Sequence, residues 1–161
     1  MKKVTSIMIE NAVIGNVVHI VLTVIYSYLK ISHATLSWLF MLLVFFSWMV
    51  IGFRFSSKGK VKKESVILIF ALISLSPIII FLISGQLLQG LSQLSGAQYY
   101  SLFYFIGAPI IAWNKPLAPF MHLFNDSNIY IQMDINIVLI YFVIFVGGFV
   151  GMQFKKAVLK K

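Results

Sequence analysis

The stretch FRFSSKGKVKKE, residues 53–64, ends one long apolar run, begins another, and carries five positive charges between them. Six further cations lie near the chain ends, so eleven of the thirteen lysines and arginines fall within 2–3, 54–63 and 155–161. Loops rich in Lys and Arg stay on the cytoplasmic side of a membrane protein. The pattern therefore predicts a membrane protein in which loop 54–63 and both termini are cytoplasmic.

Lipid is the solvent that this composition requires. Of 161 residues, 60% are hydrophobic and 11% charged, whereas a soluble domain has about 45–50% apolar and about 25% charged residues. The net charge of +9 does not indicate nucleic acid, which needs a basic face with base-reading or stacking groups beside it. The cations instead flank apolar runs. The central group is expected to contact anionic lipids of the cytoplasmic leaflet, through Arg54, Lys58, Lys60, Lys62 and Lys63.

Four apolar runs have the roughly 20 residues that a membrane-spanning helix needs: 11–29, 34–53, 65–84 and 135–154. The sequence therefore predicts an all-α integral membrane protein with four transmembrane helices. Residues 1–161 are expected to form one domain in the cell membrane, and the richness in Ile, Phe, Lys and Asn suggests an AT-rich bacterial genome. Four crossings keep both termini on the cytoplasmic side, in agreement with the charge pattern.

Residues 85–134 are expected to lie outside the four spans. Gly85 to Gln98 places leucines at helical spacing with glutamines on another face, which favours an amphipathic helix on the outer membrane surface. Tyr99 to Trp113 is too short for an ordinary crossing, and a fifth crossing would move the C-terminal lysines outside. We therefore predict that 85–113 is interfacial or re-entrant, with Trp113 and nearby tyrosines at headgroup depth, and that 114–134 is an outer loop.

The first span has a polar face. At about 100° per residue, its polar and small side chains fall within a face about 160° wide: Asn11, Gly15, Asn16, His19, Thr23, Tyr26 and Ser27. Polar groups at membrane depth need partners, so this face is expected to line the bundle interior. His19 could move protons or bind a metal. We favour a neutral, hydrogen-bonded histidine that holds helices together, because no acid lies at the same depth.

Three outer residues, Asp126, Asp134 and His122, are the candidates for acid–base catalysis or metal binding. Asn125-Asp126-Ser127-Asn128 is typical of a turn, so we favour solvated loop residues over a site. Their spacing matches no metal or catalytic motif, and no cofactor is expected.

One short motif invites comparison with an enzyme family. Phe124-Asn125-Asp126 is similar to an aspartate motif of lipoprotein signal peptidases, which have a similar size and topology and use two outer aspartates. The other motifs of that family are absent here, and the only arginine, Arg54, lies on the predicted cytoplasmic side. Membership of the family is therefore not inferred.

The fourth span carries a glycine strip of Gly147, Gly148 and Gly151. Glycines at this spacing let another helix approach closely. The approaching helix could belong to the same bundle or to a second copy of the chain, and small residues suit both contacts equally.

Few ionisable groups and long apolar surfaces favour a role in binding. We expect an accessory, assembly or immunity-type partner of another membrane component, acting through helix packing and the outer loop. Its partners would be another membrane protein or a second copy of the chain. The first alternative is a small transporter or channel subunit with a polar path between the first and third spans. The second is an outer-side membrane enzyme that uses Asp126 and Asp134; a non-enzymatic role is favoured.

Overall fold

A computed structural model describes residues 2–29, 34–59, 61–95, 100–121, 123 and 128–158. In chain order the elements are α1 (Lys2–Tyr28), α2 (Ala34–Lys58), α3 (Glu64–Ser95), α4 (Tyr100–Asn114), the 3-10 helix η1 (Lys115–Leu117), α5 (Ala118–Met121) and α6 (Ile129–Val158). These described residues contain no strand. α1, α2, α3 and α6 are long and apolar enough to cross a membrane. The prediction of an all-helical chain with four potential spans is confirmed.

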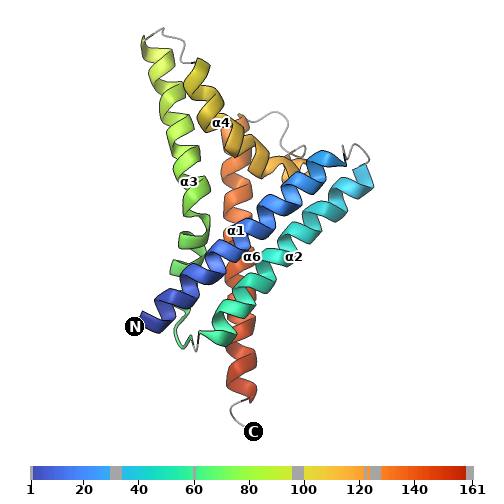
Figure 1. Ribbon diagram of the computed structural model, residues 1–161, viewed down its shortest axis with the longest axis vertical. Coiled ribbons are helices and arrows are strands. Elements are labelled where there is room, and N and C mark those ends of the chain that lie inside the picture. The colour runs from blue at the N-terminus through green and yellow to red at the C-terminus, as the bar shows by residue number, and fades with distance from the viewer. Residues whose placement is uncertain are drawn as a thin grey trace.

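The helices form a bundle that opens toward one end. α1 and α2 lie side by side and α6 crosses them, while α3 diverges from α1 (Figure 1). α4 runs from the far end of α3 back toward the C-terminal end of α1, so it closes the angle between these two helices (Figure 1). The two chain ends lie at the opposite, narrow end of the bundle (Figure 1).

The closest helix contact, between α2 and α6, depends on glycine. A Cβ on Gly147 would collide with the carbonyl oxygen of Met49, and one on Gly151 would lie 2.6 Å from that of Phe53. On the facing helix, a Cβ on Gly52 would collide with the carbonyl oxygen of Ile144. Of the two contacts that the glycine strip allows, the structure contains the one within the chain.

Aromatic and aliphatic side chains fill the interior at the narrow end. Phe55 of α2 stacks on Phe70 of α3 with ring centroids 4.0 Å apart, and both side chains are fully buried. Large apolar residues such as Val138 and Phe142 are instead exposed. In a chain with four potential spans, such residues are expected to face lipid.

The structure corrects the expected boundaries of the region between the third and fourth spans. Gly85 does not begin a separate surface helix, because α3 continues without a break to Ser95. The predicted outer loop 114–134 is largely helical where described, since it contains η1, α5 and the beginning of α6. Helix formation satisfies the backbone polar groups of these apolar segments, which is essential where water is scarce.

α3 also passes through Pro77. Proline lacks the amide hydrogen that would bond the carbonyl four residues earlier, here Ile73. The hydroxyl of Ser76 donates to that carbonyl at 2.8 Å. A side chain thus replaces the missing backbone hydrogen bond and lets the helix continue.

Candidate functional site

A polar cluster lies inside the bundle where α4 meets the other helices. Its centre is His19 of α1, only 1% exposed. The indole Nε1 of Trp48 in α2 donates to His19 Nδ1 at 3.1 Å, and His19 Nε2 lies 2.8 Å from the carbonyl oxygen of Trp113 in α4. An indole N–H only donates and a carbonyl oxygen only accepts. His19 must therefore be neutral, with its hydrogen on Nε2 and directed at Trp113.

Two local features hold the imidazole in this position. The Trp113 ring stacks on it, with centroids 4.2 Å apart and planes 15° from parallel. Gly15, one turn before His19, leaves room for the Trp48 ring, because a Cβ at this glycine would lie 2.5 Å from Trp48 Cζ3. Gly15 thus allows Trp48 to reach His19 across the contact between α1 and α2.

Two asparagines extend the cluster to α6. Asn136 Nδ2 donates to Asn114 Oδ1 at 2.9 Å, and Asn114 Nδ2 donates to the carbonyl of Ile110 at 3.0 Å. Both asparagines are at most 1% exposed. We call His19, Trp48, Trp113, Asn114 and Asn136 the central polar cluster. It ties the C-terminal end of α4 to α1, α2 and α6.

Other polar residues of the first span also bind helices together. Asn16 Nδ2 donates to the carbonyl of Ala12 at 2.9 Å and to that of Ser74 in α3 at 2.8 Å. Tyr26 shares a 3.1 Å hydrogen bond with Ser37 of α2. Asn11, at the narrow end, bonds the backbone of its own helix at Ile7. The face that the sequence assigns to the interior is therefore buried, and its groups mainly join α1 to its neighbours.

Two buried groups on this face have no hydrogen-bond partner among the described residues, the Oδ1 of Asn11 and the hydroxyl of Thr23. The Thr23 side chain is 8% exposed. The indole nitrogen of Trp113 is likewise buried without such a partner.

The sequence identifies His19 but not the other four members of the central polar cluster. Trp113, expected as a ring at headgroup depth, is 7% exposed and packs on His19. Asn136 carries a signal in the sequence, because it is an amide between two isoleucines, and Asn114 ends an apolar run. A buried amide must find a partner.

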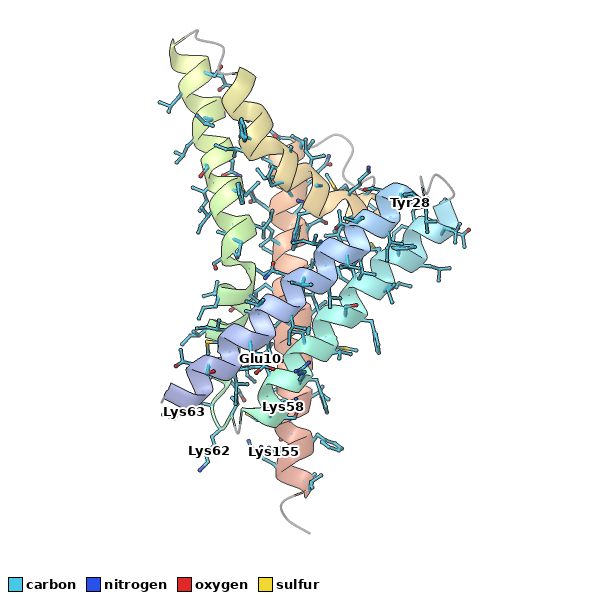
Figure 2. The ribbon with its side chains drawn as sticks, in the orientation of Figure 1. Glu10, Tyr28, Lys58, Lys62, Lys63 and Lys155 are labelled. Carbon is cyan, nitrogen blue, oxygen red and sulfur yellow. The ribbon has the colours of Figure 1, made fainter. Side chains whose placement is uncertain are left out.

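Lysines of the central and C-terminal basic clusters gather at the narrow end. Lys58, Lys62, Lys63 and Lys155 lie there together, far from Tyr28 (Figure 2). Arg54 of α2 pairs with Glu10 of α1 at 3.0 Å. Lys155 of α6 donates to the carbonyl of Ser57 at 2.7 Å, at the end of α2 where a helix dipole favours a cation. Lys60 lies outside the described residues.

Of the three outer candidates, Asp126, Asp134 and His122, only Asp134 lies among the described residues. Asp134 is exposed on α6, and its Oδ2 accepts a hydrogen bond from Gln86 Nε2 of α3 at 3.2 Å. Asp126 and His122 lie outside the described residues. Within the described part of the chain, no three His, Asp or Glu residues are grouped so as to hold a metal ion.

Two cavities flank α4. The smaller, of about 290 Å³, lies in the angle between α1, α3 and α4, and its lining includes Asn16, Thr23, Pro77 and Trp113. The larger, of about 600 Å³, lies between α4, η1, α5 and the ends of α1 and α6. Both volumes approach or fall within the range of about 300–1,000 Å³ of ligand sites in proteins.

These features define a multi-pass helical membrane protein with a buried polar junction and two lateral cavities. Comparisons with protein-family models, curated proteins and solved structures found no match to the chain.

Proposed function

We propose that this chain is a cell-membrane protein with both termini in the cytoplasm, and that it is an accessory or assembly partner of another membrane protein. In one form of this role, the chain would be an immunity protein that binds another membrane component. The proposed contact surface is the face of α3 formed by Ile83, Leu87 and Gly90, which we call the α3 outer face.

The topology is supported by the charges at the narrow end. Lys58, Lys62, Lys63 and Lys155 share that end with the two chain ends (Figures 1 and 2). Cations concentrate on the cytoplasmic side, so the wide end, with α4, would face the opposite side. Because α4 is shorter than a crossing requires and returns from the far end of α3, we propose that it is re-entrant.

Gly90 carries the proposal of a partner. Of the nine described glycines, seven would place a Cβ within 4 Å of a neighbouring atom, whereas an added Cβ at Gly90 or Gly107 meets no described atom. Gly107 lines the larger cavity, whereas Gly90 is half-buried on α3 beside Leu87, which is 63% exposed. A helix glycine that no described atom faces lets a second transmembrane helix approach closely.

The closed interior supports binding over transport. His19, the histidine within the α1 span, has both ring nitrogens engaged. Asn16 joins α1 directly to α3, where a polar path would have to run. The interior therefore serves mainly to hold the helices, which leaves the outward surfaces for function.

Site-specific photocrosslinking in native membranes tests this function. A photoreactive residue at Leu87 should capture one specific membrane protein, and Gly90→Leu should abolish the adduct because its side chain blocks close approach. A photoreactive residue at Val138, which is equally exposed on α6, is the matched control. Lipid adducts alone at Leu87, or the same protein captured equally from Val138, would contradict the proposal.

Single cysteines in this cysteine-free chain test the topology. Cysteine at Lys62 should react only from the cytoplasmic side, and cysteine at Leu123 only from the outer side. Both residues are exposed. Labelling of both from the same side would overturn the proposed topology.

Transport remains a second candidate, because the smaller cavity is lined by Asn16 and Thr23 between α1 and α3. Reconstituted protein would then carry a solute across vesicles, and Asn16→Leu would stop that flux. Absence of flux together with a stable copurifying partner would decide for the accessory role.

An enzyme that uses Asp126 and Asp134 is not favoured by any contact in the described residues. Asp134 is paired with Gln86 and lines neither cavity. If Asp126→Asn and Asp134→Asn each left the biological activity unchanged, the enzyme would be ruled out.

A further inference from the structure

The larger cavity combines apolar walls with a single cation. It is lined by Ser27, Gly107, Ala108, Ile111, Ala112, Asn114, Lys115, Ala118, Met121, Ile129 and Met133. Eight of these side chains are glycine, alanine, isoleucine or methionine, so most of the lining can only contact apolar groups. Such a lining favours a hydrocarbon occupant over a water-soluble metabolite.

The cavity exists because α4 presents small residues on this side. The side chains of Gly107, Ala108 and Ala112 are absent or short, so they leave space beside α4. A Cβ at Gly107 would meet no described atom within 4 Å. The side of the cavity toward lipid is marked by Ile111 and Ile129, which are 57% and 49% exposed. An acyl chain could therefore enter from the bilayer without crossing water.

Lys115 is the only charged residue among the described lining residues. It is exposed and forms no ion pair with the described part of the chain. Asn114, the neighbouring polar residue, is already engaged by Ile110 and Asn136. The ammonium group of Lys115 is thus available to an anion at the mouth of an apolar cavity.

The sequence gives a second reason to examine this lysine. Lys115 is one of only two cations away from the three basic clusters, on the side where cations are disfavoured. Loop lysines commonly help to set membrane topology by staying on the cytoplasmic side, but Lys115 lies on the proposed outer side.

We propose that the larger cavity binds one anionic phospholipid, with an acyl chain between α4 and α6 and its phosphate on Lys115. Basic pockets between transmembrane helices recognise anionic headgroups by the same charge complementarity. Lipid binding here does not require the protein partner proposed above, because the α3 outer face and the cavity use different residues.

Native mass spectrometry of the purified full-length chain tests the proposal. The chain is exposed to mixed micelles with equal amounts of phosphatidylglycerol and phosphatidylcholine that carry identical acyl chains. We expect one phosphatidylglycerol to be retained per chain in preference to phosphatidylcholine. Lys115→Gln should lower this preference about fivefold, the contribution of one lysine near an anionic lipid, whereas Lys62→Gln at the narrow end should retain it.

Gly107→Leu and Gly90→Leu form a matched pair, since neither glycine has a described neighbour within 4 Å of an added Cβ. Gly107→Leu should remove the retained lipid by filling the cavity, and Gly90→Leu should retain it while losing the protein crosslink at Leu87. Helical content and thermal stability are measured for both variants to identify one that fails to fold. If a glycine variant is misfolded, the lipid preference of Lys115→Gln alone tests the proposal.

Several outcomes would overturn lipid binding. They are equal retention of the two lipids by the wild type, equal losses in Lys62→Gln and Lys115→Gln, or retention unchanged in a folded Gly107→Leu. Displacement of the lipid by millimolar inorganic phosphate would show that the site takes a free anion. A copurifying protein segment lost only in Gly107→Leu would show that the cavity holds a protein helix.

Discussion

Trp48 donates its indole N–H to Nδ1 of His19 across 3.1 Å, and this one contact fixes the chemistry of the imidazole. Since an indole nitrogen cannot accept, the histidine must be neutral and must direct its own hydrogen toward the carbonyl of Trp113, 2.8 Å away. His19 is thereby a structural joint among α1, α2 and α4. A proton carrier would have to exchange hydrogens at both nitrogens, and neither is available.

Replacing His19 with leucine should destabilise the protein. The change leaves the Trp48 N–H and the Trp113 carbonyl without their present partners inside the bundle. Interhelical hydrogen bonds in membranes contribute about 0.6 kcal/mol on average and about 1.7 at most, so we expect a loss of about 1–2 kcal/mol. Thermal unfolding in detergent measures it, with Ser47→Ala, which removes only an exposed bond within α2, as the control. Equal stability of the two variants would contradict a structural role of His19 between α1, α2 and α4.

The imidazole should show a single tautomer. Nitrogen NMR of ring-labelled His19 is expected to report a neutral ring protonated at Nε2. Trp48→Phe removes the donor and should allow the other tautomer to appear. A spectrum of the wild type that shows hydrogen on Nδ1 would refute the arrangement.

Alanine at Gly147 should destabilise the contact between α2 and α6. Its Cβ collides with the carbonyl of Met49, and overpacking of this kind costs about 1–3 kcal/mol. At Gly107 no described atom lies within 4 Å of the added Cβ, so alanine there should gain about 0.5–1 kcal/mol from helix propensity. The melting temperature should fall for Gly147→Ala and rise for Gly107→Ala. Shifts of the same sign would argue against the described packing of α2 on α6.

The ion pair of Arg54 and Glu10 should contribute little. Its side chains are 35% and 54% exposed, and exposed pairs contribute about 0.2–1 kcal/mol. A double-mutant cycle with Arg54→Gln and Glu10→Gln measures the coupling, which should shrink as salt is added. Strong coupling that is independent of salt would mean that the pair is shielded from water.

The helical class and the four long apolar helices could be predicted from sequence because both depend on local composition. The runs 34–53, 65–84 and 135–154 fall within helices long and apolar enough to cross a membrane, and the run 11–29 extends one residue beyond such a helix, α1. The end of α3 could not be predicted in the same way. Gly85 and the glutamines that follow suggested a new surface helix, but packing of α3 against α4 and the contact of Gln86 with Asp134 accompany its continuation to Ser95.

The candidate site was also predicted only in part, because it depends on contacts between helices that local sequence does not show. The polar face of α1 is visible in the sequence, since its period follows from helix geometry. Its partners are not, because Trp48, Ser74 and Trp113 come from helices distant in the chain. Periodicity identifies which side of a helix needs polar partners, but it does not identify the residues that supply them.

The sequence by itself determined that four stretches of this chain are suited to the bilayer and where its positive charges lie, because hydropathy and charge are properties of the residues themselves. Only the tertiary structure decided that the glycines of α6 meet α2, that His19 is held by two tryptophans, and that Lys115 stands at the mouth of an apolar cavity. Those relationships arise from the crossing of distant helices, and the close packing that fixes each crossing involves all of the contacting side chains at once.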